Sequence, residues 1–338
     1  MPTSADLLSV RELSVSFATP AGIARAVNDV SLSIRAGERL ALVGESGSGK
    51  TVTAMSLLGL VRGATTSGQI CYGNRDLAAL SSKEWRAVRG REIGIVLQDP
   101  NSSLNPTMRV RSQVFEALRL AGVSREHRQS EAVSLLGKVG INDPARILRA
   151  YPFQLSGGQQ QRVVISIALA QQPKLLIADE PTTALDVKVQ AQVMQLLLDL
   201  GEQQHMSILL ITHDLSVVAG FAERVAVMYG GRIVELGDTI TIFESPQHPY
   251  TQGLLRSTPR ADADQGTRFD AIPGEVPPAT DLPSGCAFRL RCPFAQARCA
   301  AELPVLSGMN QAGHLVACHF AGQLEPAKRP AEPSDATA

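Results

Sequence analysis

The sequence predicts a mixed α/β fold, and three features of the chain predict it. The apolar run Leu40–Val43 is followed by a glycine-rich turn and then by a helix-compatible segment, Thr53–Leu58. Polar side chains follow the apolar runs, as they do at the carboxyl ends of strands in α/β folds, where ligands bind. A long helical pattern separates two of the further strand-length apolar runs, which lie at 93–97, 174–178 and 207–212.

The composition is that of a globular protein able to bury a sizeable core, with 338 residues, 44% hydrophobic and 19% charged. Lys plus Arg and Asp plus Glu number 32 each, so the charge balance gives no support for a nucleic-acid partner. Met1–Asp6 lacks the basic and apolar regions of a signal peptide. No apolar run approaches the ~18 residues of a membrane span, so we expect a chain that docks on a membrane at most.

The N-terminal residues 7–43 alternate apolar and polar positions in short runs, which predict antiparallel strands leading into Leu40–Val43. Ala18–Gly22 has the composition of a turn between two of these strands. Phe17 is the aromatic residue nearest the glycine-rich turn on this side. Aromatic side chains in strands mostly pack in the core, and stacking on adenine is the alternative role.

The glycine-rich turn Gly44–Thr51 matches the pattern G-x-x-x-x-G-K-[ST] of a phosphate-binding P-loop, in the strand-and-helix context that this motif requires. Backbone N–H groups and the helix N-terminus bind phosphate oxygens in such a loop. We expect Lys50 to reach the β- and γ-phosphates and the Thr51 hydroxyl to bind Mg²⁺. A glycine turn with an incidental lysine is the alternative. The predicted ATP contacts of the loop are Gly44, Ser46, Gly47, Ser48, Gly49, Lys50 and Thr51.

A helical insertion is predicted at about 100–160. The strand before it, Ile93–Leu97, ends at Gln98, and the turn formers Asp99–Pro106 predict a loop. Apolar residues at helical spacing follow over residues 110–150.

Ser156 predicts the N-cap of a helix that opens with Gly157 and Gly158. A helix N-terminus of this kind is a second candidate phosphate site, and a plain capped helix is the alternative.

Asp179 and Glu180 follow the strand pattern Lys174–Ala178. Asp179 suits Mg²⁺ coordination through water, and Glu180 suits polarisation of an attacking water. A pair of solvated loop acids is the alternative, which the P-loop upstream disfavours. His213 follows the strand Ser207–Thr212, but a histidine at a strand end is often only a satisfied polar residue.

The C-terminal part begins with a hairpin over 225–235 and a short helical segment over 240–256. Residues 256–284 are predicted to be a Pro-rich linker, 285–320 a four-cysteine extension, and 321–338 a disordered tail.

The cysteines are unevenly placed. Cys71 stands alone and is predicted to be a core or strand residue, whereas the other four crowd the extension. Without a secretion signal, this clustering indicates a metal or cluster site more than disulfides. The spacing lacks the C-x₂-C knuckles of common zinc sites, and four thiolates suit an iron–sulfur cluster. Zinc and four unliganded thiols are the alternatives, and His319 complicates the ligand set.

These pieces, in this order, resemble the nucleotide-binding subunit of an ABC transporter over roughly residues 7–255. The resemblance implies a P-loop NTPase fold of the ABC cassette type, with an antiparallel β subdomain, a helical insertion and a small C-terminal Cys-rich extension. The matching motifs are Walker A at Gly44–Thr51, the Q-loop at Gln98, the highly specific signature at Leu155–Gln159, Walker B at Leu176–Glu180, the D-loop at Ala184–Asp186 and the switch histidine at His213.

Four further segments are similar to the oligopeptide/dipeptide importer subfamily. The subfamily resemblance implies a [4Fe–4S] cluster ligated by Cys286, Cys292, Cys299 and Cys318. The segments are Gln98–Pro106, Tyr151–Arg162, His248–Thr251 and Gly285–Pro293, the last with Cys299 and Val316–His319.

The resemblance also implies the catalytic arrangement. ATP would lie between the P-loop of one subunit and Ser156, Gly157, Gly158 and Gln159 of another, with Asp186 bridging the subunits and Phe17 stacking on adenine. We assign Glu180 as general base, His213 as γ-phosphate contact and orienter, Gln98 as metal and water sensor, and Asp179 with Thr51 to Mg²⁺.

The implied partners are a homologous second ABC ATPase, in a heterodimer, and two integral membrane permease subunits that receive solute from an extracytoplasmic binding protein. The chain would sit peripherally at the cytoplasmic face of the cell (inner) membrane and drive uptake of peptides, with nickel or glycosides as alternative solutes.

Two alternatives come from other classes. A non-transport ABC ATPase acting on DNA or ribosomes would carry long coiled coils or two cassettes, and this chain shows neither pattern. A soluble P-loop kinase leaves Leu155–Gln159 unexplained.

Overall fold

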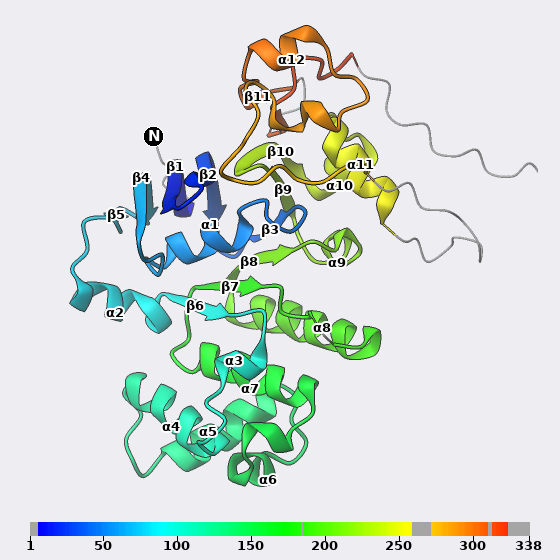
Figure 1. Ribbon diagram of the computed structural model, residues 1–338. Coiled ribbons are helices and arrows are strands. Elements are labelled where there is room, and N and C mark those ends of the chain that lie inside the picture. Colours follow the sequence, from blue (N-terminus) through cyan, green and yellow to red (C-terminus); the bar gives the residue numbers. More distant parts are fainter. Residues whose placement is uncertain (1–5, 184, 259–271, 310–312, 324–338) are drawn as a thin grey trace, which may run out of the picture.

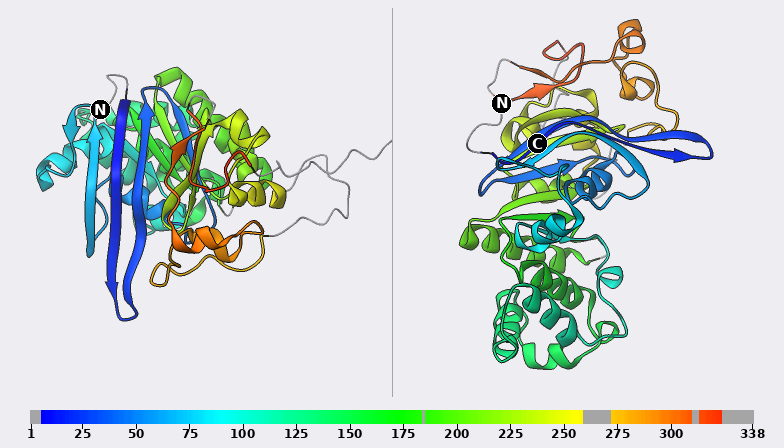
Figure 2. Two further views of the ribbon diagram at one scale, coloured as in Figure 1. Left: turned by 90° about the horizontal axis from the view of Figure 1, so that it is seen from above. Right: turned by 90° about the vertical axis from the view of Figure 1, so that its left-hand side faces the viewer.

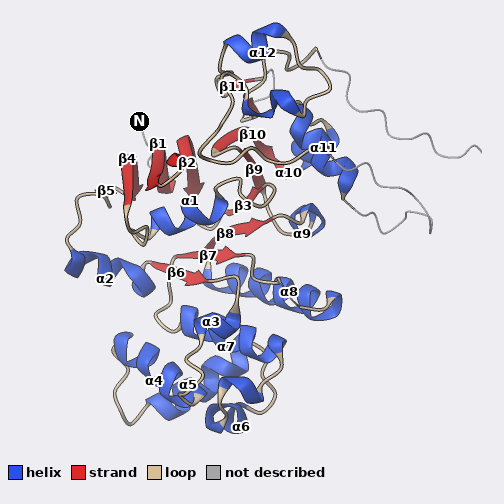
Figure 3. Cartoon of the chain, in the orientation of Figure 1, coloured by secondary structure: helices blue, strands red, loops and turns tan. Residues whose placement is uncertain are grey.

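The computed structural model describes residues 6–183, 185–258, 272–309 and 313–323, which form two β-sheets, a helical region and a C-terminal extension (Figure 1, Figure 3). Most of the predicted disordered tail, from residue 324 on, lies outside the described residues, as do 259–271 of the predicted linker and Ala184 of the D-loop.

A four-stranded antiparallel sheet carries the N-terminal segment, in the order β2-β1-β4-β5. Two of the short runs predicted here, Leu8–Val10 and Leu13–Phe17, form one long strand, because a bulge absorbs the change in register between Val10 and Leu13. Glu12 within this bulge has a φ of 51°. The strands are β1 (Asp6–Thr19), β2 (Gly22–Arg35), β4 (Ala64–Tyr72) and β5 (Arg75–Asp76).

The second sheet has eight strands in the order β11-β12-β10-β9-β3-β8-β7-β6. Strands β9, β3, β8, β7 and β6 run parallel to one another. Strands β10, β12 and β11 are added at the β9 edge, and each is antiparallel to its neighbours. Their bounds are β3 (Arg39–Val43), β6 (Ile93–Val96), β7 (Leu175–Asp179), β8 (Ser207–Thr212), β9 (Arg224–Tyr229), β10 (Arg232–Asp238), β11 (Ser307–Gly308) and β12 (Leu315–Val316).

Helices α3 to α7 lie at one end of the molecule and the extension at the other, with the sheets between them (Figure 2). The helices are α1 (Lys50–Leu57), α2 (Ser82–Arg91), α3 (Pro100–Ser103), α4 (Val110–Leu120), α5 (Arg128–Lys138), α6 (Pro144–Arg149), α7 (Gly157–Leu169), α8 (Val187–Gln204), α9 (Leu215–Ala219), α10 (Thr239–Glu244), α11 (Pro249–Ser257) and α12 (Ala297–Ala301), with 3₁₀ turns at Pro152–Gln154 and Ala287–Leu290.

Two hydrophobic cores cover opposite faces of the eight-stranded sheet. On β3, Leu40 and Leu42 belong to the core shared with α1 and the four-stranded sheet. Ala41 and Val43 point into the core formed with the helices. Because successive side chains of a strand face opposite sides, a strand buried on both faces is apolar throughout. The continuous apolar runs of the sequence arise in this way.

One predicted loop contains a helix. Asp99–Pro106 begins with the single-turn helix α3, because the Asp99 side chain accepts hydrogen bonds from the N–H groups of Asn101 and Ser102, at 2.9 and 3.2 Å. Pro100 stands at the first helical position, where its missing N–H costs nothing. The loop prediction was therefore wrong over Pro100–Ser103.

The extension is attached to the sheet through β10. Strand β12 pairs with β10, and the buried Glu235 on β10 accepts a hydrogen bond from His314 Nε2 at 2.8 Å. The same carboxylate accepts from the N–H groups of Gln247 and His248, at 2.7 and 3.1 Å. These bonds satisfy a buried carboxylate and join three segments of the chain.

Candidate active site

The backbone of the P-loop packs closely against two neighbouring strands. A Cβ at Gly44 would lie 2.2 Å from the carbonyl oxygen of Met228, and one at Gly49 would lie 2.3 Å from that of Ala26. Glycine is therefore required at both positions. Lys50 Nζ donates to the carbonyl oxygens of Gly44 and Glu45, at 2.7 and 2.9 Å. Burial lowers the pKa of Lys50, and the nearby carboxylates of Glu180, Asp179 and Glu45 oppose this effect.

The residues predicted to bind Mg²⁺ meet at the start of α1. Thr51 Oγ1 donates to Asp179 Oδ1 at 3.4 Å. Asp179 is only 2% exposed, and burial raises its pKa while the bond from Thr51 lowers it. A hydroxyl beside a carboxylate matches the oxygen ligands that Mg²⁺ prefers, so this pair fits the ion.

Glu180 is the centre of a hydrogen-bonded cluster at the ends of three neighbouring strands. Gln98 Nε2 donates to Glu180 Oε2 at 2.8 Å, and His213 Nδ1 lies 3.0 Å from Glu180 Oε1. Thr183 Oγ1 also donates to Glu180 Oε2, at 3.0 Å. Glu180 has a left-handed φ of 47°, a strained conformation of the kind found at functional sites.

These groups open onto one cavity of about 640 Å³. Its lining combines the P-loop with the three predicted catalytic residues, so the structure brings the two sets together. The described lining residues are Ala26, Glu45, Ser46, Gly47, Gly49, Lys50, Thr51, Val52, Gln98, Glu180, Thr183, His213, Leu254, Ser257 and Ala279.

The signature residues Ser156 to Gln159 lie outside this cavity. Ser156 caps α7 as predicted, because its hydroxyl accepts from the N–H of Gln159 at 3.4 Å and the Gln159 side chain accepts from the N–H of Ser156 at 3.2 Å. Gly157 and Gly158 form the first turn of α7 and do not line the cavity. Asp186 caps α8, accepting from the N–H of Val189 at 3.0 Å.

Phe17 lies on β1, where it pairs with Ala24 of β2 and packs partly buried against the core. It is not among the residues that line the cavity of the P-loop.

Comparison with known proteins agrees with this arrangement. The family model described as "ABC transporter" matches residues 27–183, and the model described as "Oligopeptide/dipeptide transporter, C-terminal region" matches residues 234–299. The chain is 46% identical over 327 residues to the dipeptide transport ATP-binding protein DppD of Escherichia coli, covering 96% of this chain and 99% of that protein.

The chain belongs to the ABC transporter ATP-binding proteins, in their oligopeptide/dipeptide branch. It is also 49% identical to the oligopeptide transport ATP-binding protein OppD of Bacillus subtilis, over 86% of this chain and 82% of that protein. A dimeric, post-hydrolysis structure of the ATP-binding cassette MJ0796, bound to ADP and Pi, superposes with a TM-score of 0.62 at 31% identity, over 69% of this chain and 98% of that one. The predicted ABC cassette fold and transport ATPase class are confirmed.

The predicted [4Fe–4S] cluster was wrong. Cys286, Cys292, Cys299 and Cys318 do line one cavity, but its volume is only about 20 Å³, roughly the space of one water. Within the described ranges, no three His, Cys, Asp or Glu residues form a group able to hold a metal ion, which also removes the zinc alternative. Burial raises the pKa of the Cys292 thiol to about 11 and also raises those of Cys286 and Cys318.

Cys71 lies in a strand, and His319 of the extension has a backbone contact. Cys71 lies on β4, partly buried, as predicted. His319 Nε2 donates to the carbonyl oxygen of Glu302 at 3.0 Å.

Across the residues that the structure covers, no helix is long and apolar enough to cross a membrane.

Sequence reasoning missed three parts of the site. Thr183 binds Glu180, and a threonine three residues after the acid was the only available signal. Tyr250 accepts a hydrogen bond from the N–H of Glu45 at 2.8 Å, and Ala279 lines the cavity. Tyr250 and Ala279 lie 205 and 234 positions after Glu45, in segments where no local pattern points to a nucleotide site.

Proposed function

We propose that this ABC transporter ATP-binding protein hydrolyses ATP to drive uptake of peptides through separate membrane subunits. One observation carries the catalytic part: Gln98 and His213 each contact the carboxylate of Glu180 by a hydrogen bond, and all three residues line the cavity that the P-loop lines. This arrangement supports the proposal that these groups act at the terminal phosphate of a nucleotide bound on the P-loop.

Each residue of this site has a proposed role. Glu180 accepts a proton from the attacking water, and His213 orients the water and contacts the γ-phosphate. Gln98 senses the metal and the water, and its loop links the site to the helical region. Lys50 and the P-loop N–H groups hold the phosphates. Thr51 and Asp179 would hold Mg²⁺, which would neutralise part of the phosphate charge.

The ATP site is proposed to be completed by a second chain. The N-terminus of α7, with Ser156, Gly157, Gly158 and Gln159, offers hydrogen-bond donors for phosphate but lies outside the cavity of its own P-loop. A head-to-tail pair of cassettes would bring this N-terminus to the partner's ATP, with Asp186 near the contact. Phe17 would meet the adenine. We propose a homologous second ATPase as the partner.

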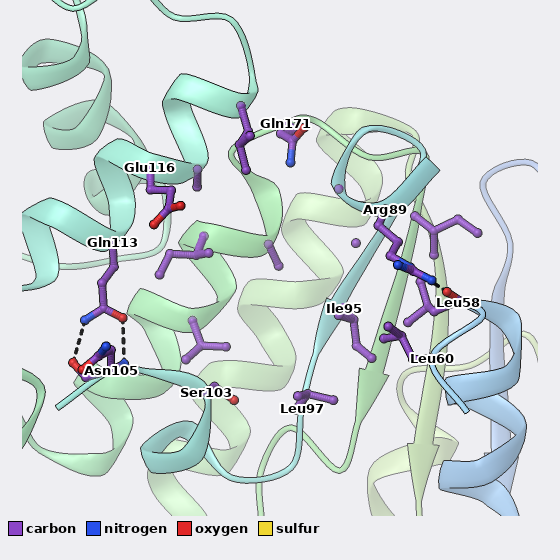
Figure 4. A pocket seen from close by; sticks show the side chains of 18 of the residues that line it. Leu58, Leu60, Arg89, Ile95, Leu97, Ser103, Asn105, Gln113, Glu116 and Gln171 are labelled. Atoms are coloured by element: carbon purple, nitrogen blue, oxygen red, sulfur yellow. Dashed lines mark hydrogen bonds between the residues drawn. The ribbon is translucent and has the colours of Figure 1, made fainter. Parts of the chain in front are cut away.

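A groove beside Gln98 is the proposed docking site for the membrane subunits. It has a volume of about 680 Å³ and lies among α1, β6, α4 and α7 (Figure 4). Its lining combines apolar residues, among them Leu58, Ile95 and Leu97, with the polar residues Arg89, Gln113 and Glu116, and Leu60 and Leu120 are exposed there by 39% and 51%. A groove that offers both kinds of contact fits a short amphipathic helix. A helix bound in the groove would then move the Gln98 loop and so affect Glu180, and a change at Glu180 would affect the groove in the same way.

Docking at this groove would place the chain peripherally at the cytoplasmic face of the membrane, and the solute would arrive from an extracytoplasmic binding protein.

The test is purification of the tagged chain from its native membrane, with an ATPase assay of the material obtained. We expect two integral membrane proteins and a second cassette ATPase to come with it, and peptides to stimulate hydrolysis when the associated binding protein is added. Elution of the chain alone or with ribosomes contradicts the transport role.

A further inference from the structure

An arginine of the extension reaches the P-loop. Arg291 Nη1 lies 2.6 Å from Glu45 Oε2, and Arg291 Nη2 lies 3.1 Å from Glu45 Oε1, although the two residues are 246 positions apart. The Arg291 side chain is 6% exposed and that of Glu45 is 27% exposed. A two-point contact between a guanidinium and a carboxylate, shielded from water in this way, fixes both orientation and charge.

The same guanidinium binds the chain that leads into the extension. Arg291 Nε donates to the carbonyl oxygen of Pro273 at 2.9 Å, and Nη2 donates to that of Ile272 at 3.3 Å. Further along this segment, the carbonyl oxygen of Ala279 accepts from the N–H of Arg25 at 2.8 Å, and Ala279 lines the same cavity as Glu45. Arg291 therefore joins the P-loop to a segment that forms one wall of the site.

The charge of Glu45 explains why this contact matters. Its carboxylate stands in a loop whose N–H groups are arranged for phosphate, and it lines the cavity beside Lys50. A carboxylate free to turn toward this cavity would repel the triphosphate and compete with it for Lys50. Paired with Arg291, the carboxylate is neutralised and points to the extension. The backbone of Glu45 is also held from this side, by Tyr250, which packs against Phe288 of the extension with ring centroids 5.3 Å apart.

We propose that Arg291 is a positioning residue of the ATP site: by holding Glu45 away from the phosphates, it lets the extension raise the affinity of the P-loop for ATP. The inference rests on the proposed assignment of this cavity to ATP. It gives the oligopeptide-type extension a part in nucleotide binding that requires no metal.

The test is a double-mutant cycle on the full chain, with MgATP binding measured by titration calorimetry. Arg291→Gln is expected to weaken binding at least about fivefold, the lower end of ordinary coupling between sites. Glu45→Gln is expected to bind as well as the wild type or better. The affinity of the double variant for MgATP is expected to lie within about twofold of that of Glu45→Gln, because no carboxylate is left for Arg291 to restrain.

The control is Arg298→Gln, which removes an arginine of the same extension whose side chain is 58% exposed and, among the described residues, pairs with Glu302. It is expected to bind MgATP like the wild type. In the assembled transporter, Arg291→Gln is expected to raise the KM for ATP with little change in kcat, a division that general loss of structure does not produce. Should Arg291→Gln not fold, Arg291→Met, which keeps the packing on Tyr229, replaces it with the same expectations.

Two results overturn the inference: wild-type affinity in Arg291→Gln, or a double variant as weak as Arg291→Gln alone. Failure of the wild-type chain to bind MgATP would instead contradict the proposed function, so the two failures are distinguishable.

Discussion

Gln98 and Glu180 are hydrogen-bonded side chain to side chain, with Gln98 Nε2 donating to Glu180 Oε2 across 2.8 Å. Gln98 follows β6 and Glu180 follows β7, two adjacent parallel strands of the sheet. The chain after Gln98 leads directly into α3 and the helical region. A displacement of that region therefore alters a hydrogen bond to the proposed base, which gives a physical route between the docking groove and hydrolysis.

Glu180→Gln is expected to reduce ATP hydrolysis by roughly 100-fold or more, because general-base catalysis commonly contributes that much. MgATP binding should remain, since Lys50 and the P-loop are unchanged. Steady-state hydrolysis of the assembled complex and equilibrium binding to the chain measure the two effects. Glu126→Gln is the control, because Glu126 is 80% exposed and far from the cavity lining. ATP hydrolysis at the wild-type rate in Glu180→Gln would contradict the assignment of Glu180 as the general base.

Ser156→Ala tests whether the site needs a second chain. Because Ser156 lies outside the cavity of its own P-loop, binding of MgATP to the isolated chain should not change, whereas ATPase activity of the assembled complex should fall. The variant also loses a helix cap, which costs about 1 kcal/mol.

Ser81→Ala is a matched control for this loss of a cap. Ser81 caps α2 with the same reciprocal arrangement, its hydroxyl accepting from the N–H of Glu84 at 3.4 Å, as that of Ser156 does from Gln159. It should lose similar stability without losing activity. Equal ATPase activity in the two variants would contradict the two-chain site.

The sequence was sufficient for the parts of the site that are local. Gly44–Thr51 and Ser156–Gln159 are short motifs whose chemistry is set within one turn and one helix start, and the structure has both as expected. The strands of the parallel sheet were also predictable, because burial on both faces makes them apolar throughout.

Non-local contacts were not predictable in this way. Nothing near Arg291 in the sequence indicates that it pairs with Glu45, since only the fold brings the two together. The cysteine prediction failed for the related reason that spacing along the chain does not specify the cavity that the side chains enclose. Here they surround a small space bordered by Phe288 and Phe294.

The stability of the fold is expected to fall as the pH is lowered from about 6.5 toward 4. Burial lowers the pKa of His248 to about 4, so the unfolded chain binds a proton that the folded chain excludes in this window. The free energy of unfolding therefore rises with pH and loses on the order of 3 kcal/mol on acidification. Denaturant unfolding at a series of pH values measures this slope.

His248→Asn should flatten the slope, because Asn cannot titrate but can still accept the N–H of Tyr250, as His248 Nδ1 does at 3.1 Å. His205→Asn is the control: His205 is exposed and has a φ of 49°, a conformation that Asn tolerates. An unchanged slope in His248→Asn would assign the acid sensitivity to other groups.

Leu60→Asp tests the docking groove. A carboxylate on this apolar surface would have to be desolvated by a bound helix, so co-purification with the membrane subunits should fall by at least about tenfold. MgATP binding to the isolated chain should be unchanged, because Leu60 does not line the nucleotide cavity. Ile240→Asp is the matched control, since Ile240 is 71% exposed on α10 and lies outside the groove.

If both variants retain the membrane subunits equally, the docking surface lies elsewhere on the chain. If both lose them, the effect comes from an added surface charge and not from the groove. Loss confined to Leu60→Asp places the contact beside the Gln98 loop, where docking can act on Glu180.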